Sequence, residues 1–173
     1  MLRRNRNSRA TAVALVVAWL LGAAVAWAQT KPVSPTPSKS VGADNADALA
    51  LAYKTAIDVN DIDGRLELHY WEGTDAKDAR RLRKTFEEDA ARHPKVLSSA
   101  VTKLDGPARA AYAESVSKDG NGRKPNLDPT ARLDIAVEIP QPGGSTVKSL
   151  LVFPVGEKEG RAYIVGYMAK PKK

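Results

Sequence analysis

The sequence predicts an α+β fold in which N-terminal helices pack on a curved antiparallel sheet of about four strands. The main observation is a change in the spacing of apolar residues. They recur at the helical period of 3.6 before Pro94 and at the strand period of two after it. Helices followed by strands, each half burying one apolar face, give this fold class.

The first helix is expected to begin at Asp44, whose carboxylate can accept backbone N–H bonds as an N-cap. Asp47 then lies near the positive end of the helix dipole. The helix ends at the polar pair Asn60-Asp61. Its expected apolar face consists of Leu49, Tyr53, Ala56 and Ile57.

Asp61 can cap a second, short helix that ends near Gly73. Thr74 and Asp75 offer the cap of a third helix, which stops before Pro94 because the residue before a proline resists the helical conformation. In this third helix the apolar residues and the charged residues lie on opposite faces. The apolar row is Ala79, Leu82, Phe86 and Ala90, and the charged row is Lys77, Arg81, Lys84 and Glu88.

Strand periodicity begins at residues 96–104 and is clearest at Leu133–Ile139, where strict alternation predicts a half-buried strand. Glycine-rich turns follow at residues 142–145 and 156–160. The last three strands, at 133–139, 147–153 and 161–168, are therefore expected to form an antiparallel meander.

A long interval, residues 105–130, separates the first strand from this meander. Pro107 can start a short helix that runs to Val116, and the polar loop Lys118–Arg123 follows it. Intervals of this length in a small domain are often functional or mobile.

The N-terminus has the features of an export signal. Residues 1–9 carry four arginines and no acid, and the next 19 residues, up to Ala28, carry no charge. Small residues at Ala26 and Ala28 predict cleavage after Ala28, which would place the mature protein in the periplasm or outside the cell. The alternative is an uncleaved membrane anchor, since about 20 apolar residues span a bilayer.

The rest of the chain is expected to hold one domain at residues 44–169. A Pro- and Ser-rich linker, residues 29–43, precedes it, and a basic tail, residues 170–173, follows. Eighteen of the 27 basic residues and all 20 acidic residues lie in the domain, which is therefore close to neutral. This balance argues against a nucleic-acid partner, which requires a concentrated cationic face.

Candidate chemistry is sparse. His69 is the best general acid or base, with Asp61 and Asp63 near it in sequence. The alternative is that His69 packs or caps at a helix end. The chain has no cysteine, its two histidines are 24 positions apart, and no Gly-x-Ser-x-Gly or phosphate-binding glycine loop occurs. No metal and no cofactor are expected.

This order of elements resembles the cone-shaped α+β superfamily that includes SnoaL-like and ketosteroid-isomerase-like proteins. Residues 53–61, followed by 66–70, are similar to the opening of those proteins, where a helix ends at an acidic turn and a second short helix begins. The strand that usually lies between the second and third helices is not evident here. The resemblance implies an apolar cone that can hold a ligand and sometimes an acid/base pair.

We therefore expect a non-enzymatic exported domain that binds a small apolar ligand or an envelope protein. Two alternatives stay open: a small isomerase or dehydratase using His69 with Asp61 or Asp63, and a structural envelope subunit. The sequence leaves the oligomeric state open. The expected pocket-lining residues are Tyr53, His69, Tyr70, Trp71 and Phe86.

Overall fold

The computed structural model describes residues 39–169, which form four helices and one four-stranded antiparallel sheet. This confirms the predicted α+β class. In chain order the elements are α1 (Ala46–Asp58), α2 (Ile62–Glu67), α3 (Ala76–Ala90), β1 (Lys95–Lys103), α4 (Gly106–Asp119), β2 (Pro129–Pro140), β3 (Thr146–Lys158) and β4 (Arg161–Ile164).

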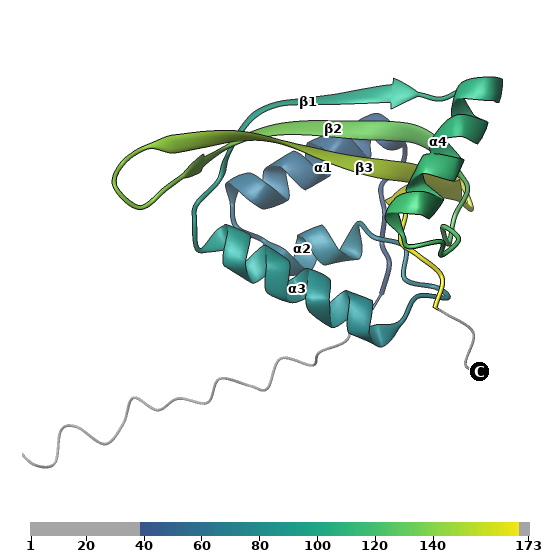
Figure 1. Cartoon of the computed structure of the whole chain (residues 1–173), viewed down its shortest axis with the longest axis horizontal. Helices are drawn as coiled ribbons and strands as arrows, with labels where there is room; N and C mark the ends of the chain where they lie inside the picture. Colours follow the sequence, from purple (N-terminus) through teal and green to yellow (C-terminus); the bar gives the residue numbers. More distant parts are fainter. Residues whose placement is uncertain (1–38, 170–173) are drawn as a thin grey trace, which may run out of the picture. The chain divides into compact units, whose positions relative to one another are not determined.

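The sheet is a meander with the strand order β1-β2-β3-β4. Burial alternates along β2 as the sequence predicts, and Leu133, Ile135 and Val137 are almost completely buried. These side chains face α1, α2 and α3, which lie together on one side of the sheet (Figure 1). The helix α4 lies near one end of the sheet, in contact with β2.

The core between helices and sheet is built around Tyr53 of α1, which has no exposed surface. Its ring centroid lies 4.9 Å from that of Phe153 on β3 and 6.4 Å from that of Phe86 on α3. Burying rings of this size supplies much of the apolar area that stabilises a small domain without disulfides.

The helix caps differ from the prediction at one position. Asn45, not Asp44, caps α1, since its side chain accepts a hydrogen bond from the Ala48 N–H at 2.9 Å. Asp44 instead forms an ion pair with Arg161, 3.3 Å away. Asp61 and Asp75 cap α2 and α3 as expected.

The helix α2 ends at Glu67, six residues before the expected end, because the following main chain pairs with β4. The Ile164 N–H donates to the carbonyl of Leu68 at 2.9 Å, and the Tyr70 N–H donates to the carbonyl of Ile164 at 3.0 Å. These bonds form a short parallel bridge between His69 and Ile164. This bridge lies between α2 and α3 along the chain, and it fixes His69 against the sheet.

The folded unit begins before residue 44, where the linker was expected to end. Ala43 is buried and exchanges two main-chain hydrogen bonds with Ala162, of 2.9 and 2.7 Å. Within residues 39–43 the only apolar side chain larger than that of alanine is Val41, so a pattern search based on apolar periodicity misses this contact. The predicted signal peptide, most of the linker and the basic tail lie outside the described residues.

The C-terminal strands also differ in length from the prediction. The strand β3 continues to Lys158, and a tight turn at Glu159 and Gly160 joins it to β4. Both turn residues have positive φ, 52° and 74°, which matches the two-residue turns preferred in twisted hairpins. After Ile164 the chain makes only isolated bridges, and α4 is longer than the predicted segment 107–116. Within residues 39–169, no helix has the length and apolar character to cross a bilayer.

Candidate functional site

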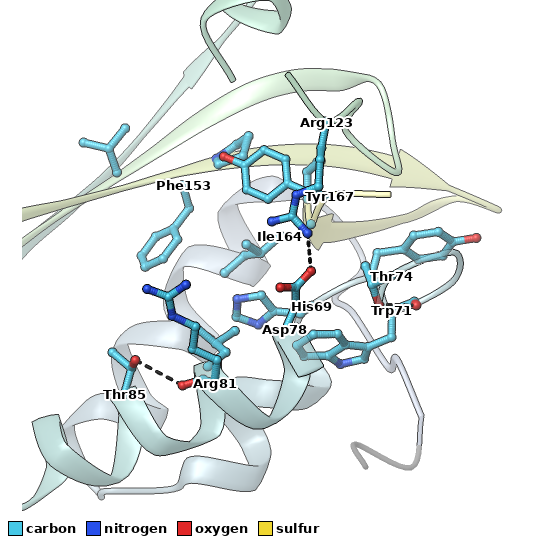
Figure 2. Close-up of a pocket in the computed structure, with 16 residues that line it drawn as sticks. His69, Trp71, Thr74, Asp78, Arg81, Thr85, Arg123, Phe153, Ile164 and Tyr167 are labelled. Carbon is cyan, nitrogen blue, oxygen red and sulfur yellow. Dashed lines mark hydrogen bonds and ion pairs between the residues drawn. The ribbon is translucent and has the colours of Figure 1, made fainter. Parts of the chain in front are cut away.

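A cavity of about 340 Å³ opens between α3, the segment 69–74, β3 and the chain that follows β4 (Figure 2). Its apolar walls include Trp71, Leu82, Phe153 and Ile164. Polar side chains also face it, namely His69, Thr74, Asp78, Arg81, Thr85 and Arg123. An apolar interior with a few polar groups is the usual composition of a small-molecule site.

His69 forms part of the inner wall and is only 5% exposed. Its ring stacks on Trp71, with the centroids 5.4 Å apart. Its Nδ1 lies 2.9 Å from the carbonyl oxygen of Arg65, so Nδ1 carries the proton and donates it. Burial lowers the pKa of His69 to about 4, which keeps the imidazole neutral at physiological pH.

The other nitrogen of His69, Nε2, has no hydrogen-bond partner within residues 39–169. In the neutral tautomer that Arg65 selects, Nε2 carries a lone pair and accepts hydrogen bonds. The site therefore offers an acceptor at this point, and neither a proton nor a positive charge.

One face of α3 supplies four of the lining residues, because Asp78, Arg81, Leu82 and Thr85 follow helical spacing. Figure 2 shows the Arg81 side chain extending from α3 toward Phe153. The Thr85 hydroxyl donates to the Arg81 carbonyl at 3.1 Å, so only its oxygen remains to accept a bond from a ligand.

The opposite rim is formed by Arg123 and Tyr167. Arg123 forms an ion pair with Asp78 and lies over the Tyr167 ring, 5.1 Å from its centroid. The ring of Tyr167 lies against Gly120, where a Cβ would come within 2.4 Å of Tyr167 Cδ1. Glycine at position 120 is thus required for Tyr167 to stand at this rim.

Asn126 ties the loop after α4 to the floor of the site. Its side-chain amide donates to the Tyr70 carbonyl at 2.6 Å, and its Oδ1 accepts from the Gly166 N–H at 2.8 Å.

The Tyr70 hydroxyl donates a hydrogen bond to the Glu72 carboxylate. This bond raises the Tyr70 pKa to about 12 and keeps the phenol neutral.

Behind the cavity wall lies a buried cation, Arg65, which is 3% exposed. Its guanidinium carbon is 3.7 Å from the Phe86 ring centroid, and its Nη2 is 3.8 Å from the Asp89 carboxylate. Its Nη2 also donates to the Tyr53 hydroxyl at 3.5 Å, and burial raises the pKa of Tyr53 to about 12.

The expected site residues are thus divided. His69, Tyr70 and Trp71 line the cavity, whereas Tyr53 and Phe86 lie in the core behind it because both pack around Arg65. Neither Asp61 nor Asp63, the two candidate partners of His69 in the enzymatic alternative, lines the cavity.

The two carboxylates are engaged elsewhere. Asp61 accepts from the Gly64 N–H at 2.8 Å as the cap of α2, and it borders a shallow hollow beside α1. Asp63 is exposed and forms an ion pair with Arg83 at 2.5 Å. The His/Asp pair expected for an isomerase or dehydratase is not assembled. No cluster of three or more potential metal ligands occurs within residues 39–169.

Sequence reasoning missed Asp78, Arg81, Arg123 and Tyr167. Arg81 was placed in a charged row opposite the apolar one, yet its spacing from Asp78 and Thr85 carries the signal, since residues at i−3 and i+4 lie on the same helix face. Arg123 and Tyr167 come from irregular segments, where no periodicity indicates a direction.

Comparison with known proteins adds little. No family model matches the chain, and no curated protein matches it. Among solved structures, the chain is similar to a protein from Xanthomonas campestris described provisionally as a calcium/calmodulin dependent protein kinase II association domain, with 16% identity and a TM-score of 0.42. The match covers 73% of this chain and 86% of the other. Similarity at this level transfers neither ligand nor activity.

Proposed function

We propose that this protein is an exported, non-enzymatic binding domain that takes a small, largely apolar molecule into the cavity beside His69. The observation that carries the proposal is the cavity itself. Its volume of about 340 Å³ lies within the range of small-ligand sites, and aromatic and aliphatic side chains form most of its walls. A relationship to SnoaL-like proteins is part of the same proposal, since the apolar interior of those proteins often holds a ligand.

The chemistry of the lining supports binding over catalysis. General acid/base catalysis is most efficient when the pKa of the group lies near the working pH. The pKa of His69, lowered to about 4, makes it a weak base. The one carboxylate in the lining, Asp78, is already paired with Arg123. A small enzyme would have to rely on His69 Nε2 alone.

Features of the N-terminal sequence support export and therefore a location in the envelope or outside the cell. The basic N-terminus, the uncharged run to Ala28 and the small residues before Gln29 all come from the sequence. A domain without cysteines in that compartment must derive its stability from its core. The apolar core around Tyr53 provides this stability.

The test uses the protein purified after export and titrated with N-phenyl-1-naphthylamine, a neutral apolar dye whose emission rises in dry sites. We expect saturable binding of one dye per chain. Leu82→Phe, which adds volume inside the cavity, is expected to weaken binding at least about tenfold. Leu51→Phe is the matched control, because Leu51 is 65% exposed on α1.

Thermal melts of both variants separate blocked binding from failed folding. Absence of saturable binding to the wild type would remove the proposed function. Undiminished binding to a folded Leu82→Phe variant would place the dye elsewhere and also contradict the proposal.

A further inference from the structure

We propose that the ligand of this cavity is a monoanionic organic acid, whose carboxylate binds Arg81 while its apolar body lies against Trp71 and Phe153. The inference rests on the proposed function and adds the chemical class of the ligand. Its basis is the charge balance of the cavity.

Most arginines of the domain already have a carboxylate partner. Residues 39–169 contain nine arginines, and six of them lie within 4.0 Å of an aspartate carboxylate. The three without such a partner in this part of the chain are Arg80, Arg81 and Arg92. Of these, only Arg81 lines the cavity.

The other charged side chains at the cavity neutralise each other. Asp78 is paired with Arg123, and His69 is neutral, so Arg81 contributes one uncompensated positive charge. Figure 2 shows its guanidinium extending into the space beside Phe153 and His69, away from the Asp78–Arg123 pair. Arg81 is exposed, so water reaches its guanidinium, but the apolar walls on one side still strengthen its attraction for a counter-ion relative to open water.

Hydrogen-bonding capacity points the same way. The Thr74 hydroxyl donates to the Trp71 carbonyl at 2.6 Å and the Thr85 hydroxyl donates to the Arg81 carbonyl, so both leave only acceptor capacity. His69 Nε2 is an acceptor as well. Apart from the neutral Tyr167 hydroxyl and Arg123, which is paired with Asp78, the donors among these lining side chains come from Arg81, whose planar fork matches the two oxygens of a carboxylate.

A single guanidinium also selects against more highly charged ligands. A phosphate dianion is typically held by several cations or by backbone N–H groups at a helix N-terminus. The cavity has one free cation among the described residues, and α3 presents a side face to it, not its N-terminus. One negative charge on an apolar body is the complement of this lining.

The test compares 2-naphthoate with its uncharged amide, 2-naphthamide, by displacement of N-phenyl-1-naphthylamine from the exported protein. We expect the acid to bind about fivefold more tightly than the amide, since an ion pair with an exposed guanidinium contributes less than a buried charge-assisted hydrogen bond. Arg81→Gln is expected to abolish that preference, which is measured as the ratio of the acid and amide affinities and therefore does not depend on any change in dye affinity. Arg80→Gln, one position along the same helix and outside the cavity, should leave the preference intact.

The outcomes separate the two proposals. Dye binding with equal affinity for acid and amide in the wild type would overturn the carboxylate inference and leave the binding function standing. A preference that survives in Arg81→Gln would also overturn it. If neither the dye nor the acid nor the amide binds to the wild type, the proposed binding function itself is wrong.

Discussion

The Nδ1–H of His69 donates to the carbonyl oxygen of Arg65 at 2.9 Å, one helical turn earlier in the chain. This bond fixes the tautomer of a buried imidazole and directs its lone pair away from the main chain. The same residue, Arg65, places a guanidinium in the core beside Phe86. The backbone of Arg65 thus orients the cavity wall while its side chain occupies the layer behind that wall.

The buried imidazole makes the stability of the domain depend on pH. Burial lowers the pKa of His69 from 6.5 to about 4, so the unfolded chain takes up a proton before the folded one does. The free energy of unfolding should therefore fall as the pH drops below about 6.5, and His69 should account for about 2 to 3 kcal/mol of this loss by pH 4.5.

The measurement is denaturant unfolding of wild type and His69→Gln at pH 7 and pH 4.5. Carboxylates titrate in both proteins, so the difference between the two losses reports on His69. His93→Gln is the control, since His93 is exposed. Equal losses in wild type and His69→Gln would show that His69 is not buried in its neutral form.

The Arg65–Asp89 pair should be worth more than an ordinary surface pair. Asp89→Asn removes the counter-ion of a cation that is 3% exposed, and we expect it to cost about 1–2 kcal/mol of unfolding free energy, less than for a fully buried pair because the Asp89 side chain is 31% exposed. Glu88→Gln disrupts the exposed pair with Lys84 and should cost less than about 0.5 kcal/mol. Equal costs in urea unfolding would argue against the buried position of Arg65.

Gly120 should be essential to the rim of the cavity. A Cβ at position 120 would lie 2.4 Å from Tyr167 Cδ1, so Gly120→Ala forces the Tyr167 ring out of its place. We expect dye affinity to fall at least about threefold and stability to fall by about 1–3 kcal/mol. In Gly106→Ala the new methyl group meets no atom within 4 Å, so this control should retain wild-type binding and stability. Tight binding in Gly120→Ala would show that Tyr167 plays no part in holding the ligand.

Export makes a separate prediction about the mature N-terminus. If the sequence before Gln29 is a signal peptide, protein recovered from the periplasm should begin at Gln29, as intact-mass spectrometry would show. Replacing Ala28 with a bulky residue such as Phe should cause the uncleaved form to accumulate in the membrane fraction. Finding only the 173-residue chain there in the wild type would favour the membrane-anchor alternative.

The fold was more accessible from the sequence than the site. Alternation along Leu133–Ile139 predicts β2 because one face of that strand meets the core and the other does not. Asp61 and Asp75 mark two helix starts, since their carboxylates satisfy backbone N–H groups locally. Such features act within one turn or one strand, where sequence spacing and spatial distance coincide.

The site depends on contacts between distant segments, which local spacing does not contain. Asp78 meets Arg123, 45 positions away, and Asn126 bonds to the Tyr70 carbonyl, 56 positions away. Asp61 was a candidate partner for His69 by proximity in sequence, but its carboxylate caps α2 and borders the hollow beside α1, not the cavity. Arg81 is exposed like its neighbours in the charged row, and it lines the cavity because β3 and the chain after β4 lie opposite its face of α3, which local spacing does not show.

Energy transfer from Trp71 to bound N-phenyl-1-naphthylamine tests the central claim most directly. Trp71 lines the cavity and is the only tryptophan after Ala28, so it reports on this site alone in the cleaved protein. The account predicts that Trp71 emission falls in proportion to dye binding, with one dye per chain, and that 2-naphthoate restores it. Saturable dye binding that leaves Trp71 emission unchanged would contradict the account, because the dye would then occupy a place remote from His69 and Trp71.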